Sequence, residues 1–484
     1  MRAILPILLA LALAGCGSDG HTDKSGGDAA PVTLRMATME ADSAPYADGV
    51  REFARQVEDL SGGSLRIDVV WDGATEYLGE FGRSADQKVA GLIQSGELDM
   101  GLIPARSWDR LGVTSLQALQ APFLVDNEAL VDAVVTSDLA RDMLAGLDEA
   151  GVVGIALLPE GLRYPVGFDG PMTKPGDFAG ATLRVFPSDA SSRLFEALGA
   201  RTVDVNGEDF DTATRDGTLV GAESEFLRGG ELPRPGAFTA NLSVYAKESA
   251  IVASQDAWGR LSGDQRDVLR EAAARAQRFM IEHDPTEAER AEVYCRVGGR
   301  IVLAPDEDVA AVHAAAEPVY AALEADPRTK AFIARLRAMK ERVPPQPLPD
   351  PCAPAPEESD TPAGASTPKR FPEGVYRRDI SAEYLIAHGM DEITAHDIDG
   401  QITLTIEDGR WSGRTSGIAG DCHGPYEIES GRISLYHDEA QCGGPAGLLV
   451  MSAGWRLDGD EFRFVDVRVG RPLEWGGPPW TKIG

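Results

Sequence analysis

Prolines divide this chain into two regions of unequal length. Residues 344–372 read PPQPLPDPCAPAPEESDTPAGASTPKRFP and hold 10 of the chain's 31 prolines. Proline has no amide hydrogen and a fixed φ, so neither a helix nor a central strand can run through this stretch. The sequence therefore predicts an extended linker at 344–370 between a large region, 32–343, and a small region, 371–484. At 484 residues the chain is also too long for a single core.

The first 31 residues are typical of an export signal followed by a tether. A basic start at Met1-Arg2 precedes an apolar run, Ile4 to Leu13, and the small residues LAG lead directly to Cys16. The run is too short to span a bilayer. The segment LAGC that ends at Cys16 resembles the bacterial lipobox, which implies that residues 1–15 are a signal peptide and that Cys16 is lipidated. An ordinary secretory signal is the alternative, and residues 16–31, rich in Gly, Ser and Asp, are expected to form a flexible tether.

The large region alternates strand-like and helical patterns, which predicts an α/β architecture. The strand-like runs VTLRMATM and SLRIDVVW flank an expected helix from about Ala44 to Leu60, ended by Gly62-Gly63. Further on, Ser262 and Gln265 have the spacing of a capping box at the start of a long helix. We expect the apolar side chains along one face of each of these helices to be part of the core.

The small region has the pattern of a small antiparallel barrel or sandwich. The segments TLTIEDGRW, YEIESGRISLY and WRLDGDEFRF each place a turn pair between alternating strands. Three such hairpins within the last third of the chain favour a small antiparallel β-barrel.

The cysteines agree with export to an oxidising compartment. Apart from Cys16 there are four, Cys295, Cys352, Cys422 and Cys442, which allow three pairings. Pairing within each region is favoured, Cys295 with Cys352 and Cys422 with Cys442. No Cys-x-x-Cys spacing occurs, so neither zinc nor a thioredoxin-type site is expected.

A net charge of −31 argues against nucleic acid and anionic lipid as partners. Against this background one arginine is notable, because the strand-like segment GATLRVFPSD places Arg184 between Leu183 and Val185. A guanidinium stays charged and its planar fork matches a carboxylate. Its partner is either a resident Asp or Glu or the carboxylate of a bound solute, and the residues alone leave both open.

The large region resembles the solute-binding proteins of TRAP transporters, the DctP-like family. The resemblance spans roughly residues 32–341 and is carried, in order, by SGGSLRIDVVWDG, LIQSGELDMGLIP, MTKPGDFAGATLRVF, FEALGARTVDV and ATRDGTLVGAESEF. It implies a two-lobed α/β fold of the periplasmic-binding-protein kind (class II, TRAP type), with a second lobe at roughly 155–240. Such proteins close over small organic acids, without a cofactor.

The same resemblance implies a binding site. Arg184 matches the arginine that grips the substrate carboxylate, and Arg163, in PEGLRYPVGF, matches a second arginine of the cleft. Glu223 keeps the acidic position of the family motif in LVGAESEF. Glu223 and Ser224 are therefore expected to be substrate-binding residues along with the two arginines. Val220 and Ser224 replace the usual Asp and Asn of that motif, so a solute outside the usual C4-dicarboxylate or sialic acid types is expected.

The small region resembles, more loosely, lipocalin-like modules at the C-termini of actinobacterial binding lipoproteins, through FPEGVYRRDIS and EWGGPPWTKIG. Its tryptophans are expected to be core rather than pocket. Its histidines have no metal-ligand spacing. These residues are Trp411, Trp455, Trp475 and Trp480, and His388, His396, His423 and His437.

The sequence bears on three classes of function. An enzyme is disfavoured because the sequence has no nucleophile elbow, no His-Glu-x-x-His and no phosphate loop. The favoured reading is an exported lipoprotein on the outer face of the cell membrane, which captures a small anionic solute and delivers it to TRAP permease subunits. An orphan lipoprotein for ligand sensing or cell-surface interaction is the alternative.

Overall fold

The protein is described from a computed structural model. It describes residues 31–42, 46–72, 85–296, 299–352, 371–387, 396, 399–415, 422–429, 432–436, 438, 449–458, 461–469 and 478–483. Cys16, Cys442 and most of the proline-rich linker lie outside these residues, and so do Trp475, His388 and His437. The predicted signal peptide, the acylation site and the Cys422–Cys442 pairing therefore stay predictions.

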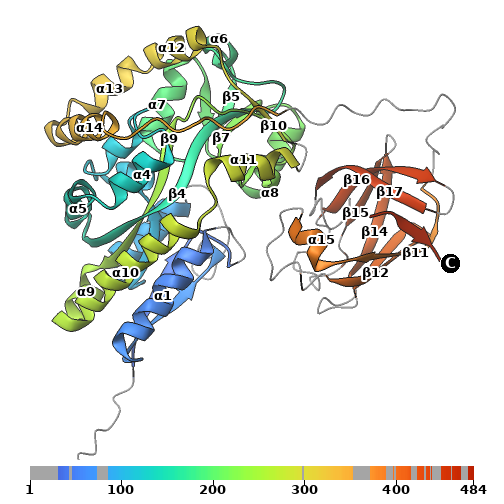
Figure 1. The fold of residues 1–484 in the computed structure, drawn as a ribbon, viewed down its shortest axis with the longest axis horizontal. Coiled ribbons are helices and arrows are strands. Elements are labelled where there is room, and N and C mark those ends of the chain that lie inside the picture. The colour runs from blue at the N-terminus through green and yellow to red at the C-terminus, as the bar shows by residue number, and fades with distance from the viewer. Residues whose placement is uncertain are drawn as a thin grey trace, which may run out of the picture.

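The first lobe is built on parallel strands covered by helices (Figure 1). Its elements are β1 (Val32–Thr38), α1 (Ala47–Ser61), β2 (Leu65–Val70), α3 (Ala85–Gln94), β3 (Met100–Pro104), η2 (Ala105–Leu111), η3 (Gln117–Gln120), α4 (Glu128–Val135), α5 (Asp138–Ala145), η4 (Gly146–Ala150), α9 (Gln255–Arg260) and α10 (Gly263–His283). The expected first helix is present, and Gly62 ends it with a left-handed φ of 60°. The predicted capping box at Ser262 and Gln265 is present at the start of α10.

The second lobe repeats this design with shorter strands. Its elements are α6 (Pro175–Phe178), β5 (Thr182–Arg184), α7 (Asp189–Ala197), β6 (Arg201–Val203), α8 (Gly207–Arg215), β7 (Gly221–Ser224), η5 (Gly229–Glu231), β8 (Ala237–Thr239), α11 (Glu287–Arg296) and β10 (Arg300–Val302). Helices α12 (Asp306–Ala315), α13 (Glu317–Leu323) and α14 (Pro327–Lys340) follow and pack across α6, α7 and α4.

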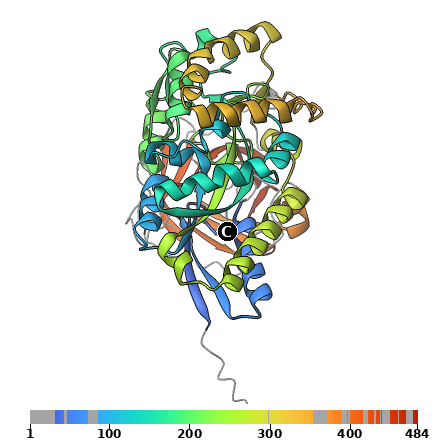
Figure 2. The same cartoon turned by 90° about the vertical axis from the view of Figure 1, so that its left-hand side faces the viewer.

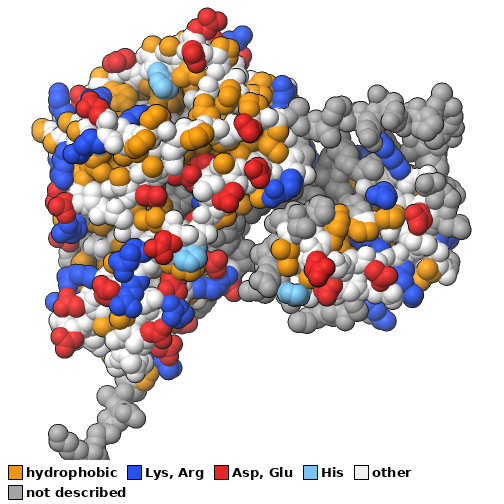
Figure 3. Space-filling view, in the orientation of Figure 1, with side chains coloured by type: hydrophobic (Ala, Val, Ile, Leu, Met, Phe, Trp, Pro, Cys, Tyr) orange, Lys and Arg blue, Asp and Glu red, His pale blue; other side chains and the backbone are white. Residues whose placement is uncertain are grey.

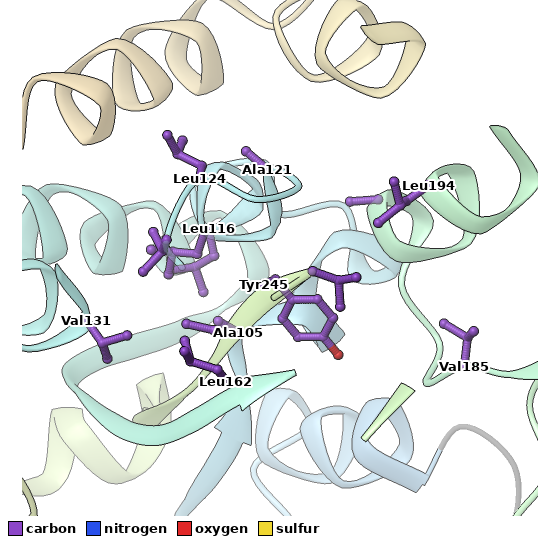
Figure 4. Close-up of a cluster of buried hydrophobic side chains, with 14 of the residues drawn as sticks. Ala105, Leu116, Ala121, Leu124, Val131, Leu162, Val185, Leu194 and Tyr245 are labelled. Carbon is purple, nitrogen blue, oxygen red and sulfur yellow. The ribbon is translucent and has the colours of Figure 1, made fainter. Parts of the chain in front are cut away.

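Two long strands join the lobes. These are β4 (Val152–Gly167) and β9 (Tyr245–Ser254), which pair antiparallel, so that the sheet runs in the order β2-β1-β3-β9-β4-β7-β5-β6. β4 bulges near Gly161, whose φ of 114° suits glycine, and a Cβ there would come within 2.4 Å of the Arg290 guanidinium. The apolar core continues from one lobe into the other, and Figure 4 shows Tyr245 of β9 among its aliphatic side chains.

The small region is a closed antiparallel barrel, whose strands are coloured orange to red in Figure 1 and Figure 2. Its elements are β11 (Gly374–Ile380), α15 (Ala382–Ala387), β12 (Gly400–Glu407), β13 (Arg410–Thr415), β14 (Cys422–Glu429), β15 (Arg432–Tyr436), β16 (Leu449–Asp458), β17 (Glu461–Val469) and β18 (Trp480–Lys482). The predicted turn at Asp408-Gly409 closes the β12–β13 hairpin, and both residues have positive φ. Trp411, Trp455 and Trp480 are all core residues.

A disulfide ties the start of the proline-rich segment to the second lobe. Cys295 in α11 is joined to Cys352, with their Cα atoms 6.0 Å apart, which is the pairing that the sequence favoured. The backbone N–H of Ile301, in β10, donates to the Cys352 carbonyl, and the Cys352 N–H donates to the Ile301 carbonyl. These two hydrogen bonds place Cys352 beside β10. The start of the proline-rich segment, up to residue 352, is therefore attached to the second lobe.

Candidate functional site

The candidate site lies where the parallel strands of both lobes end. Arg184 is the last residue of β5, and Arg106 lies two residues beyond the end of β3. In open α/β sheets, ligands bind beyond the carboxyl ends of the strands. In the view of Figure 4, the Tyr245 ring lies between Ala105 and Val185, the chain neighbours of these two arginines.

Arg184 has neutral hydrogen-bond partners. Its Nε donates to the Val205 carbonyl at 3.3 Å and its Nη2 to the Asn206 side-chain oxygen at 2.6 Å. Within the part of the chain that the structure describes, no carboxylate lies within 4.0 Å of its guanidinium. Burial lowers the pKa of Arg184 to about 10; the Glu223 charge opposes this shift, and the neighbouring cations Arg163 and Arg106 add to it. The group stays cationic at neutral pH, and among the described residues the carboxylates that act on it, Glu223 and Asp204, lie beyond ion-pair distance.

Three guanidinium groups surround the ring of Phe186. The carbon of Arg184 lies 3.7 Å from the ring centre, that of Arg106 4.3 Å and that of Arg163 5.3 Å. An aromatic face attracts cations, which offsets part of their mutual repulsion. The cluster is a buried concentration of positive charge in an acidic protein.

Arg163 differs from Arg184 because it is already paired. It lies on β4 with 2% of its surface exposed, and its guanidinium faces Glu225 at 3.6 Å and Glu223 at 4.0 Å. Burial alone would lower the pKa of Arg163, but the Glu225 and Glu223 carboxylates raise it above its usual value. The structure thus places this sequence-predicted site residue in a resident ion-pair network.

Glu223 and Ser224 lie on β7 but face opposite sides of the sheet. Glu223 is fully buried, and its Oε1 accepts from the Tyr245 hydroxyl at 3.0 Å and from the Phe186 amide at 3.4 Å. Successive side chains of a strand alternate, and Ser224 pairs across with Tyr164 of β4. Glu223 therefore belongs to the cluster around Phe186, whereas Ser224 is not brought to it.

Arg106 is the residue that sequence reasoning missed. It is 3% exposed, and its Nη2 donates to Asp86 of α3 at 2.8 Å. The available signal was its position, since the run GLIPARSWD places a cation directly beyond a buried strand. That signal is weak, because many arginines after strands are solvated.

Hydrogen bonds join the two lobes beside the cluster. Asp109 of η2 accepts from the Ser188 hydroxyl at 2.8 Å and from the Asp189 amide at 2.7 Å, at the N-terminus of α7. Gln87 of α3 donates to the Pro187 carbonyl at 2.9 Å. A carboxylate at a helix N-terminus is favoured by the helix dipole, so these contacts hold the lobes together across the site.

Within the described ranges, no three or more His, Cys, Asp or Glu side chains are grouped so as to hold a metal ion. In the same ranges, no helix has the length and apolar character needed to cross a bilayer. Figure 3 shows acidic and basic side chains interspersed on one face of the lobes.

Known proteins and a family model match the large region of the chain. Residues 36–326 match the family model of bacterial extracellular solute-binding protein, family 7 (DctP). The C4-dicarboxylate-binding periplasmic protein DctP of Rhodobacter capsulatus is 21% identical over 256 residues, which is 51% of this chain and 72% of that protein. A solute-binding protein of Verminephrobacter eiseniae is 24% identical over 196 residues, which is 40% of this chain and 56% of that protein.

Solved structures share the fold of the lobes. A TRAP periplasmic solute binding protein from Xanthobacter autotrophicus Py2, with bound β-D-galacturonate, superposes with a TM-score of 0.56 at 21% identity, covering 63% of this chain and 99% of that one. The sugar acid binding protein DctPAm from Advenella mimigardefordensis, in complex with galactonate, gives a TM-score of 0.56 at 21% identity, covering 64% and 98%. The two-lobed α/β fold is therefore shared over almost the whole length of these proteins.

Proposed function

The chain belongs to the family of bacterial extracellular solute-binding proteins, family 7, and from that premise we propose that it captures a small organic acid on Arg184 and delivers it to a TRAP-type permease. The family and its structural neighbours are binding proteins, not enzymes. Relatives carry the names of C4-dicarboxylate-binding proteins, and structural neighbours hold galacturonate, glucuronate and galactonate. All of these ligands are carboxylates.

One observation carries the proposal for this chain. Arg184 is a partly buried guanidinium whose hydrogen-bond partners are a carbonyl and an amide oxygen, so no carboxylate of the described residues is bound to its planar fork. A buried cation without an anion is costly. A solute carboxylate that meets its planar fork supplies the missing charge, and the bond strengthens as water is excluded.

Binding and closure are coupled in this proposal. Arg184 approaches the solute from the second lobe, while Arg106 and the interlobe contacts of Asp109 belong to the first. A solute drives closure only if it binds the closed form better. The closed, loaded form is then the species that the permease recognises.

The test compares two substitutions of Arg184 by calorimetry on a panel of organic acids. Arg184→Ala removes charge and fork and should weaken binding at least about 30-fold, or roughly 2 to 5 kcal/mol. Arg184→Lys keeps the charge but loses the planar fork, so its affinity should lie between those of the parent and of Arg184→Ala. The melting temperature without solute should change little, because neutral acceptors lose less than a paired carboxylate would.

The matched control is Arg193→Ala, on the exposed face of α7, which should bind like the parent. An Arg184→Ala protein that binds as tightly as the parent and melts far lower would assign the arginine to the fold instead of the solute.

The lipid anchor is a separate part of the proposal. It rests on the LAGC site before Cys16 and on the Gly, Ser and Asp rich tether that follows. Cys16→Ser should move the protein from the membrane fraction to the soluble fraction. Unchanged retention in the membrane fraction would exclude acylation at this cysteine.

A further inference from the structure

Residues 343–352, here called the strap, follow the last helix of the lobes. The family match ends at residue 326, so the strap lies beyond the part of the chain that the family model covers. Five of its ten residues are proline, and residues 344–351 form neither helix nor strand. A proline-rich extended segment is a semi-rigid spacer of about 3.1 Å per residue. The strap therefore holds its two ends at a nearly fixed separation.

One end of the strap is attached to the first lobe. Just before it, the Lys340 ammonium of α14 donates to the Phe123 carbonyl at 2.9 Å and to the Asp126 carboxylate at 2.6 Å. Within the strap, the Gln346 side-chain oxygen accepts from the Ala129 N–H of α4 at 3.2 Å. An amide in the first turn of a helix has no acceptor in its own helix, so Gln346 supplies one.

The other end is attached to the second lobe. Cys352 is bonded to Cys295 of α11, and its backbone exchanges two hydrogen bonds with Ile301 of β10. Between the two ends most strap residues are exposed, among them Leu348, and a cavity of about 720 Å³ is lined by the strap, α4 and α11. The strap thus spans this cavity, and its position depends mainly on its two attached ends.

The strap lies outside the candidate site. Leu162 and Tyr164 line the cavity, and they flank Arg163 along β4. Successive side chains of a strand alternate, so the cavity is on the face of β4 opposite to the Arg163 side chain. A change in the strap can therefore alter the placement of the lobes without removing any group from the cluster around Phe186.

We propose that the strap is a brace between the lobes, which favours their closed arrangement through its disulfide attachment to the second lobe. Both ends of the strap are attached in the same structure in which Asp109 joins the lobes across the site. A semi-rigid spacer fits one separation of its ends, so a different placement of the lobes strains it or breaks one end. Contacts that one arrangement makes better than another shift the population toward that arrangement.

The experiment measures lobe opening in the full chain without any solute. The Asp189 and Ala190 N–H groups, in the first turn of α7, donate to the Asp109 carboxylate of the first lobe at 2.7 Å and 3.4 Å. They have no acceptor in their own helix. Their hydrogen exchange, followed at single-residue resolution, therefore reports how often the lobes separate.

Two variants each release one end of the strap. Gln346→Ala removes the acceptor at α4, and Cys295→Ser with Cys352→Ser removes the bond to α11. Each should speed exchange of the Asp189 and Ala190 amides at least threefold, while amides inside β1 and β5 exchange as in the parent. The combined variant should be no faster than the faster of the two, because one broken end already releases the strap.

Asp350→Asn, at an exposed position of the strap, is the control and should exchange as the parent does. If either variant leaves exchange at the two α7 amides unchanged or slows it, or if the two effects multiply in the combined variant, the strap is not a brace. Faster exchange to the same extent in β1 and β5 would be a general loss of stability and would also exclude the proposal. Because no solute is present, none of these outcomes depends on whether Arg184 binds a carboxylate.

Discussion

Charged side chains run through the interior of the two lobes, whereas the barrel is filled mainly with aromatic and aliphatic side chains. Where β4 and β9 cross, the Lys247 ammonium lies between Glu40 and Glu160, and all three are at most 6% exposed. In the barrel, the ring of Phe462 packs against neighbouring rings, with the centre of Tyr376 at 4.7 Å and that of Phe371 at 5.0 Å.

This contrast between the two interiors bears on where a solute could bind. Burying a charge is costly unless a partner or a solute compensates it. Several buried charged groups of the lobes keep atoms without a hydrogen-bond partner among the described residues, Arg106 among them, and Arg184 has only neutral hydrogen-bond partners. The proposed site rests on the neutral partners of Arg184. The described interior of the barrel consists mainly of packed aromatic and aliphatic side chains.

The largest loss of stability is expected from a substitution in the interior of the barrel. Phe462 is 1% exposed, and Phe462→Ala removes a ring from the centre of the aromatic cluster, at a cost of about 4 kcal/mol from lost burial and the cavity left behind. Hydrogen exchange on the full chain should show protection lost in β11 to β18 and kept in the lobes. Leu457→Ala, at an exposed position of β16, is the control. Equal loss of protection in the lobes would show that the two interiors are coupled.

A charge deletion in the lobes should cost somewhat less. Arg163→Met leaves the Glu223 and Glu225 carboxylates buried without their shared cation, so the free energy of unfolding should fall by about 3 kcal/mol. Adding Glu225→Gln should recover part of the loss, as a double-mutant cycle by denaturant melts would measure. Simple additivity of the two changes would contradict the ion-pair network.

The smallest effect is a pH dependence confined to the lobes. Burial, together with the Glu287 charge, raises the pKa of Glu128 from 4.5 to about 7. The folded protein then holds this proton more firmly than the unfolded chain does. The stability contributed by this group is fully present below about pH 4.5 and is lost as the pH rises through about 7.

Glu128→Gln should therefore reduce the difference in unfolding free energy between pH 5 and pH 8 by about 1 to 2 kcal/mol, after allowance for solvent at this half-buried group. The amide oxygen can still accept the Glu287 N–H, which lies 2.8 Å from Glu128 Oε1. Glu196→Gln, on the exposed side of α7, is the control. If the unfolding free energy of Glu128→Gln depends on pH as that of the parent does, the proton is bound by a group other than Glu128.

Local signals predicted the elements well. The capping box at Ser262, the glycine end at Gly62 and the turn at Asp408-Gly409 all form as expected, because each depends on residues within one turn of chain. The motif in LVGAESEF predicts that both Glu223 and Ser224 bind the solute, and it does not encode that the alternation of β7 directs them to opposite faces of the sheet.

Local and compositional signals of the chain were enough to predict the two classes of fold and to favour the Cys295–Cys352 pair. Which cations are already paired became visible only in the folded structure. Arg163 meets carboxylates about 60 residues away, and Arg106 meets the Phe186 ring 80 positions further along the chain. Charge partnership is a property of distance in space, which short-range patterns along a chain do not encode.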